Sequence, residues 1–142
     1  MTQPIPDGFE PWHPGSSFMT HLADLGAFYR RSDSNVLAMR IAEPHTNTHN
    51  IAHGGLLATL ADTALGHCIV QQAQVSVVTV QMSVEYLNAV KPGDWLEAHV
   101  HIDKQGRRLM YATCLLKVED KVMLKANAVF AVRAAARLAS DG

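Results

Sequence analysis

Residues 47–72, NTHNIAHGGLLATLADTALGHCIVQQ, constrain the fold of this chain more than any other segment. They contain its one Gly-Gly pair and a single carboxylate, Asp62, in an otherwise apolar run. The polar residues 47–50 suit a loop or a helix cap better than a helix interior. We therefore expect a loop up to His53 and a helix from Gly54 onward.

The glycines at the start of this helix suit the binding of an oxyanion or a polarised carbonyl. The first backbone N–H groups of a helix have no partner within the helix and carry a partial positive charge. Because Gly54 and Gly55 have no Cβ, a ligand can approach these N–H groups closely.

Asp62 lies too far from His53 for the two side chains to meet within one chain. Nine residues of helix place it half a turn around and about 13 Å along the axis. If the helix start and the carboxylate belong to one site, the carboxylate must come from a second copy. The spacing therefore predicts a dimer, on the condition that both groups are functional.

The rest of the helix shows two kinds of side chain. Small residues share the stripe of Asp62 and clear space around it, namely Gly55, Ala58, Thr59 and Gly66. The remainder is apolar nearly all round, which is typical of a buried helix: Leu56, Leu57, Leu60, Ala61, Ala64, Leu65, Cys68 and Ile69.

Before this helix we expect an arm, a short helix and a hairpin. Residues 1–15 hold four of the six prolines, so this arm is predicted to be extended or irregular. Ser16 or Ser17 can cap a helix that runs to Leu25 and ends at Gly26. Two strands separated by the turn-like SDSN form a first hairpin, at residues 27–31 and 36–42.

After the helix the pattern becomes that of strands. β-Branched residues, mainly Val, are frequent in residues 75–87, and Pro92 and Gly93 form a turn after this first strand. Apolar and polar residues alternate in the second strand, as expected of a half-buried antiparallel strand. The expected strands are residues 75–87, 95–103, 107–118 and 122–132.

One buried helix among antiparallel strands predicts an α+β fold in which a curved sheet wraps around the helix. An edge strand of that sheet can pair across a dimer. The composition, 48% hydrophobic and 18% charged over 142 residues, suits one soluble domain. A net charge of −1 gives no general attraction to nucleic acid or to an anionic membrane.

The remaining features favour a cytoplasmic protein without a metal or a separate cofactor. No leader and no apolar run of about 18 residues is evident. Cys68 and Cys114 lack the spacing of zinc ligands and are expected to be small buried residues. His45, His49 and His53 recur every four residues, but their polar, proline-containing segment argues against a metal-binding helix.

The pattern Asn47, His53-Gly54-Gly55 and Leu60-Ala61-Asp62, followed by Thr79 and Tyr86-Leu87, resembles hotdog-fold acyl-CoA thioesterases of the phenylacetyl-CoA thioesterase (PaaI-like) type. The resemblance extends over residues 18–133. It implies a hotdog thioesterase domain at residues 16–134, after the irregular arm at 1–15 and before a short tail at 135–142. It also implies a homodimer, or a dimer of dimers, that binds acyl-CoA.

The resemblance implies a role for each matching residue. The N–H of Gly54 or Gly55 would polarise the thioester carbonyl, and Asp62 of the partner subunit would act as general base or nucleophile. Asn47 would place the water or the carbonyl, and His53 would lie near the thioester. Thr79 would lie against the site from its strand. Such a set is chemically sufficient, because a thiolate leaving group needs little acid assistance.

Three further points concern the substrate. Relatives often have glycine where this chain has Asn50, which puts the substrate class rather than the chemistry in question. Lys104, Arg107 and Arg108 form a solvated turn or, in a thioesterase, bind the phosphates of coenzyme A. Residues that either line an acyl pocket or belong to the core are Met39, Met82, Tyr86, Trp95 and Met110.

Two other functions remain open at the level of sequence. A hotdog hydratase or dehydratase of acyl thioesters would need a histidine paired with a carboxylate, which His53 and Asp62 could form only across subunits. A non-catalytic acyl-CoA-binding module would have no need of a carboxylate beside an uncharged thioester. No DNA-recognition helix is evident.

Overall fold

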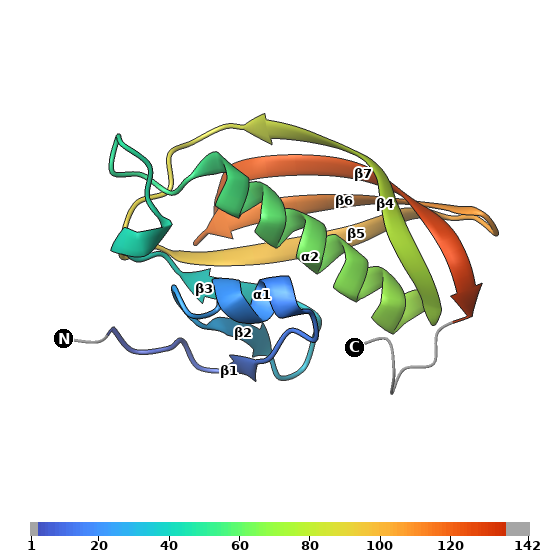
Figure 1. The fold of residues 1–142 in the computed structure, drawn as a ribbon, viewed down its shortest axis with the longest axis horizontal. Coiled ribbons are helices and arrows are strands. Elements are labelled where there is room, and N and C mark those ends of the chain that lie inside the picture. Colours follow the sequence, from blue (N-terminus) through green and yellow to red (C-terminus); the bar gives the residue numbers. More distant parts are fainter. Residues whose placement is uncertain (1–2, 136–142) are drawn as a thin grey trace.

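The computed structural model describes residues 3–135 and shows a seven-stranded antiparallel sheet that curves around one long helix (Figure 1). The strand order is β1-β2-β3-β5-β6-β7-β4. The elements are β1 (Phe9–Trp12), α1 (Ser17–Leu22), β2 (Phe28–Arg31), β3 (Leu37–Arg40), η1 (Glu43–His45), α2 (Gly54–Ala73), β4 (Val75–Tyr86), β5 (Trp95–Gln105), β6 (Leu109–Val118) and β7 (Lys121–Ala135). This arrangement confirms the predicted fold, a hotdog fold.

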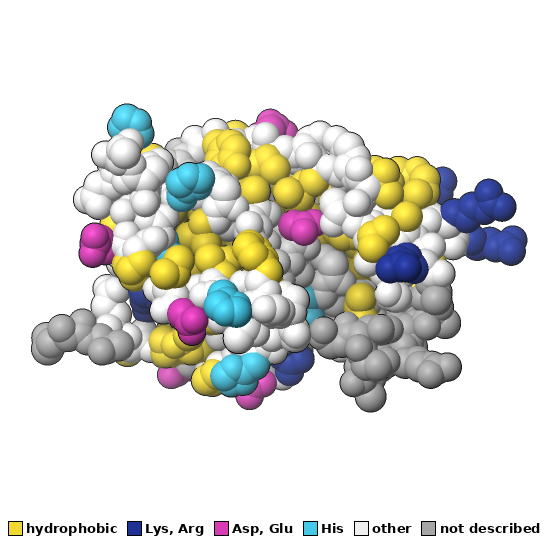
Figure 2. All heavy atoms as spheres, viewed as in Figure 1, with side chains coloured by type: hydrophobic (Ala, Val, Ile, Leu, Met, Phe, Trp, Pro, Cys, Tyr) yellow, Lys and Arg dark blue, Asp and Glu magenta, His cyan; other side chains and the backbone are white. Residues whose placement is uncertain are grey.

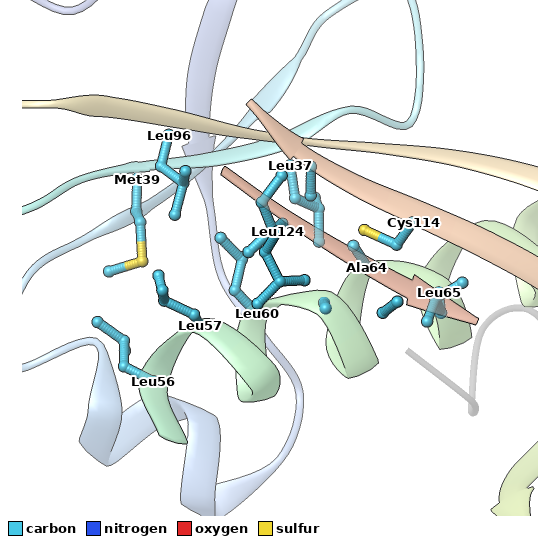
Figure 3. Packing of buried hydrophobic residues seen from close by; sticks show 14 of the residues in the cluster. Leu37, Met39, Leu56, Leu57, Leu60, Ala64, Leu65, Leu96, Cys114 and Leu124 are labelled. Atoms are coloured by element: carbon cyan, nitrogen blue, oxygen red, sulfur yellow. The ribbon is translucent and has the colours of Figure 1, made fainter. Parts of the chain in front are cut away.

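The central helix α2 begins and ends at residues that terminate helices well. His53 is its N-cap, and Gln74 ends it with a left-handed φ of 59°. One side of α2 is buried against the sheet, where its leucines meet residues of β3, β5, β6 and β7 (Figure 3). The predicted start at Gly54 is confirmed. The buried residues are the predicted ones, Leu56, Leu57, Leu60, Ala61, Ala64, Leu65, Cys68 and Ile69.

The other side of α2 is only partly covered by the described residues, among them Met19 of α1 and Thr79 of β4. Ala58, Thr59, Asp62 and Gly66 are all partly exposed. The expected small residues beside Asp62 therefore lie on a partly exposed side, while the rest of the helix is buried as expected.

The long strand β4 pairs with β7 on one side and forms one edge of the sheet. Thr79 pairs with Phe130 and Gln81 with Val129, so Val80 is an extra residue in a bulge. A bulge reverses the alternation of side chains along a strand. Thr79 before the bulge and Tyr86 after it therefore both reach α2, where each bonds to a helix residue.

The N-terminal segment is more regular than its prolines suggest. Phe9–Trp12 forms β1, which pairs with β2 along its whole length and forms the other edge of the sheet. Of the two predicted alternatives, an extended or an irregular arm, this stretch is extended. Ser16 caps α1 as expected, but this helix ends at Leu22 rather than at Leu25.

The strands β2 and β3 form the predicted hairpin. Of the predicted C-terminal tail, residues 136–142 lie outside the described part of the chain. Cys68 and Cys114 are buried and free, and burial raises the pKa of each thiol to about 12, which confirms them as small core residues. Among residues 3–135, no helix is both long and apolar enough to cross a membrane.

Candidate active site

Asn47 organises the loop that leads into α2. Its Oδ1 accepts the N–H of His49 at 2.9 Å, and its own N–H bonds to the carbonyl of Ile51. Asn50 has a φ of 59°, a left-handed conformation that glycine and asparagine adopt more readily than other residues. Asparagine in place of glycine is therefore compatible with this loop.

The first N–H groups of α2 are not equivalent. His53 Nδ1 accepts the N–H of Gly55 at 2.9 Å, so the N-cap already uses that donor. No partner for the N–H of Gly54 is found among the described residues. Of the two predicted donors, Gly54 is therefore the one that is available to a ligand.

Tyr86 on β4 closes one side of this helix start. Its hydroxyl donates to the carbonyl of Gly54 at 2.9 Å, and a Cβ on Gly54 would lie 3.3 Å from its ring. Asn47, Gly54, Gly55 and Tyr86 line a cavity of about 470 Å³ together with residues of the segment after β4. We call this space the glycine cavity. Its walls place one free backbone donor beside an amide side chain.

Asp62 lies in the middle of the open side of α2. Thr79 Oγ1 on β4 donates to Asp62 Oδ1 at 2.6 Å, which leaves Oδ2 without a partner among the described residues. A cavity of about 540 Å³ surrounds this pair and is lined by small and apolar side chains, including Phe18, Met19 and Met82. We call it the carboxylate cavity. The hydroxyl fixes the rotamer of a carboxylate that faces an open space.

Within one chain, the two halves of the predicted site are separate. The glycine cavity and the carboxylate cavity have no lining residue in common. The structure thus places Asn47 with Gly54 and Gly55 at the glycine cavity, and His53 at the N-cap beside Gly55. It separately joins Asp62 to Thr79. This matches the distance argument from the sequence.

The basic residues lie at neither half. Lys104, Arg107 and Arg108 line a third cavity of about 520 Å³ at the turn between β5 and β6. That hairpin extends past the end of α2, opposite to the helix start (Figure 1). Figure 2 shows Lys and Arg side chains gathered at this end and hydrophobic side chains exposed over the side that carries α2 and β4.

His45 is buried, with 3% of its surface exposed, and supports the loop before α2. Its Nδ1 accepts the N–H of Ala42, and its backbone carbonyl accepts the N–H of His53. Burial lowers the pKa of His45. A Cβ at Gly26 would lie 2.6 Å from its ring, so only glycine leaves room there. Among the described residues no group of three or more metal-binding side chains is found.

The residues predicted either to line an acyl pocket or to belong to the core divide into two groups. Met39 and Met110 are core residues, and Trp95 packs against Phe9 and Tyr29. Met82 lines the carboxylate cavity, and Tyr86 lines the glycine cavity. Sequence reasoning missed Phe18 and Met19, because only the folded position of α1 brings them beside Asp62.

One long helix held by a curved antiparallel sheet defines the hotdog fold. The family model described as the thioesterase superfamily matches residues 49–125, more than half of the chain. A Pseudomonas aeruginosa protein named provisionally as an esterase, PA0474, is 36% identical over 89% of this chain and 96% of its own. The chain belongs to the thioesterase superfamily, and it is a thioester hydrolase.

Other comparisons agree. Mouse acyl-coenzyme A thioesterase 13 is 33% identical over 55% of this chain and 56% of its own. A hypothetical thioesterase of Streptococcus pneumoniae, solved with coenzyme A, has a TM-score of 0.68 at 28% identity and covers 71% of this chain and 82% of its own. The PaaI protein of E. coli shares the fold, with a TM-score of 0.68 at 22% identity over 77% of this chain and 75% of its own.

Proposed function

We propose that this protein hydrolyses an acyl-CoA thioester to a free carboxylic acid and coenzyme A. Similarity to mouse acyl-coenzyme A thioesterase 13 supports this substrate, as does similarity to a Streptococcus pneumoniae thioesterase solved with coenzyme A. The observation that carries the proposal is Asp62, whose carboxylate is fixed by Thr79 and faces an open cavity. Coenzyme A enters as part of the substrate, and the reaction needs no further cofactor.

The glycine cavity would bind the thioester carbonyl. The free N–H of Gly54 would donate to the carbonyl oxygen, and that hydrogen bond would strengthen as negative charge develops on the oxygen. Asn47 Oδ1 is engaged by the loop, so its amide N–H₂ is the group left to bond the carbonyl or the attacking water. His53 holds the loop and the helix start in place through its bond to Gly55.

Asp62 of the partner subunit would supply the base. In this scheme it takes a proton from water, the water oxygen bonds to the carbonyl carbon, and the carbon–sulfur bond breaks. The sulfur leaves as a thiolate, which needs little acid assistance. Direct attack by the carboxylate, with later hydrolysis of the anhydride, uses the same residue and the same donor.

A second copy of the chain would pair along β4. This edge strand has twelve residues and one charge, Glu85, and its Val78 and Val80 are 45% and 59% exposed. An exposed, long and apolar edge favours pairing with another strand. Antiparallel pairing of β4 with its copy would place the start of one α2 beside the partner's α2, and so would complete two sites.

Antiparallel pairing of β4 would also determine where the nucleotide part of coenzyme A binds. In an antiparallel dimer, the hairpin between β5 and β6 of one chain would point toward the helix start of the other. Arg107 and Arg108, with Lys104 beside them, would then bind the phosphates of coenzyme A through the guanidinium geometry that suits them.

The first experiment measures thiol release from a panel of acyl-CoAs, aryl-acetyl, benzoyl and medium to long chain, by the wild type and by Asp62→Asn. We expect the variant to lose about 10²-fold or more of its rate while it stays folded and dimeric. An Asp62→Asn enzyme at full rate would remove Asp62 from the mechanism. Thiol release also separates hydrolysis from hydration, which leaves the thioester intact.

A mixing experiment tests whether two chains share each site. Gly54→Val fills the space before the free N–H, so homodimers of Gly54→Val and of Asp62→Asn are both expected to be inactive. After unfolding and refolding together, a mixed dimer has one site with both lesions and one with neither. About a quarter of the wild-type activity should return for an equal mixture. A mixture without activity would show that each site lies within one chain.

A further inference from the structure

A second cavity lies behind the carboxylate cavity, between the N-terminal segment and the second half of α2. It has a volume of about 260 Å³, and its walls include Trp12, Met19, Gly66, His67, Val70 and Val77. We call it the rear cavity. Most of its walls are apolar, and Gly66 adds no side chain, so there is room for a small apolar group.

The rear cavity adjoins the space around Asp62. Ser16, Met19 and Thr63 line both cavities. The partition between them is a contact of Thr63 Oγ1 with Met19 Sδ at 3.5 Å. Methionine has three rotatable side-chain bonds and adapts readily to irregular spaces. A change of the Met19 rotamer would therefore join the two cavities.

The wall of the rear cavity contains one polar group without a partner. His67 lines the cavity, and no hydrogen bond to its Nε2 is found among the described residues; this atom is buried, so a rotation of the ring would be needed to present it to the cavity. The ring packs edge-on against Trp12, with 5.1 Å between the ring centroids. Burial, and secondarily the charge of Arg30, lowers the pKa of His67, so the ring is neutral near neutral pH and has one N–H and one acceptor nitrogen.

We propose that the rear cavity receives the far end of the acyl group and that His67 bonds to an oxygen atom there. This inference rests on the proposed function, because it places the thioester beside Asp62. The preferred substrates are then acyl groups with a hydroxyl or carbonyl oxygen at the far end, over apolar groups of the same length.

The dimensions of α2 support this assignment. Asp62 and His67 are five residues apart, about 7.5 Å along the helix axis. A short acyl chain, or a benzene ring with one substituent, spans such a distance. A buried polar group that stays unpaired costs free energy, so a substrate that pairs with His67 gains against one that leaves it unpaired.

The test compares two thioesters that differ only at the far end, hexanoyl-CoA and 6-hydroxyhexanoyl-CoA. For the wild type we expect kcat/KM to be about three- to tenfold higher with the hydroxyl, the worth of one hydrogen bond. His67→Leu should bring this ratio to about one, whereas His67→Gln, which keeps a donor and an acceptor, should retain part of it. His13→Leu changes an exposed histidine of the N-terminal segment and should leave the ratio unchanged.

The ratio of kcat/KM values is insensitive to a general loss of folded enzyme, because both substrates suffer equally. Equal kcat/KM values in the wild type would overturn the inference and leave the proposed function standing. So would a preference that persists in His67→Leu. If the wild type cleaves neither thioester nor any other acyl-CoA, the proposed function fails and the inference falls with it.

Discussion

The two sides of α2 differ in almost every physical property. The side that faces the sheet has leucines and other apolar residues with almost no exposed surface, such as Leu60 and Leu65. The open side has Gly55, Ala58 and Asp62, all at least partly exposed, and continues into β4, an edge strand of the sheet that the described residues form. One side of the helix serves folding and the other is left for a ligand and a second chain.

This difference explains why a single carboxylate is tolerated in an apolar helix. Asp62 meets a hydroxyl rather than the core, and its free oxygen faces a cavity. A carboxylate at a position such as Leu60 would lose its hydration without compensation. Small residues around Asp62 keep the open side accessible, so substitutions on the two sides should have different consequences.

The largest expected effect is on stability, from a substitution on the side of α2 that faces the sheet. Leu60→Ala removes a fully buried side chain and should lower the free energy of unfolding by about 2–5 kcal/mol. Thr59→Ala, one residue away on the open side, loses only a local bond to the carbonyl of Gly55 and should cost less than about 1 kcal/mol. Urea unfolding of both variants measures the contrast, and equal losses would contradict it.

Charges on the edge strand β4 should prevent dimerisation through the open side of the molecule. We expect the double variant Val78→Lys with Val80→Lys to be monomeric and to lose about 10²-fold or more in thiol release, because each site lacks the partner's base. Pro11→Lys, on the edge strand β1, serves as the matched control and should stay dimeric and active. Sedimentation equilibrium gives the oligomeric state. A fully active monomer would refute the shared site.

The basic hairpin should affect binding rather than chemistry. Replacing both Arg107 and Arg108 by alanine should raise KM for an acyl-CoA about tenfold, since charged hydrogen bonds to phosphate are lost. The N-acetylcysteamine thioester of the same acyl group has no phosphates, and its KM should not change. Lys121→Ala, at the turn between β6 and β7, is the control. Equal effects on both thioesters would exclude phosphate binding.

Thr79 should have a smaller effect on the open side. Thr79→Val keeps the shape of the side chain but removes the hydrogen bond to Asp62, and we expect kcat to fall about fivefold with little change in thermal stability. Thr79→Ser retains the hydroxyl and should keep most of the rate. If valine and serine variants are equally active, the bond to Asp62 has no role in turnover.

The smallest expected effect is a loss of thermal stability at acidic pH. Burial lowers the pKa of both His45 and His67 below the usual 6.5, so the folded protein keeps them neutral while the unfolded chain takes up protons. Their contribution to stability is therefore complete above pH 6.5 and is lost as the pH falls through that value toward the folded pKa values. The melting temperature should fall over this range, and less in His45→Asn. An identical fall would contradict this assignment.

Much of the fold could be predicted from the sequence. Polar loop residues followed by glycines, in residues 47–54, predict the start of a helix. The helix begins at the predicted residue, Gly54. The prolines of the N-terminal segment predict an extended or irregular arm without distinguishing the two, and pairing with β2 makes Phe9–Trp12 a strand despite Pro11. Proline is compatible with an edge strand, where an N–H is not needed on the outer side.

The site was less accessible to such reasoning. No residue type signals the bulge at Val80, yet the bulge allows both Thr79 and Tyr86 to reach α2. Nor could the sequence show that His53 already uses the N–H of Gly55 and leaves that of Gly54 free. The bulge and the bond from Gly55 to His53 both depend on three-dimensional geometry. Local sequence patterns do not distinguish Val80 from its neighbours in the strand, or Gly54 from Gly55.

The sequence by itself determined the helix α2, its buried residues and the distance between its start and Asp62, because these follow from local propensity and from the fixed rise of a helix. Only the tertiary structure decided which side of α2 stays open and which residues of distant segments, such as Met19 and Thr79, lie beside Asp62. Those contacts join positions far apart in the chain, and they form only when the sheet closes around the helix.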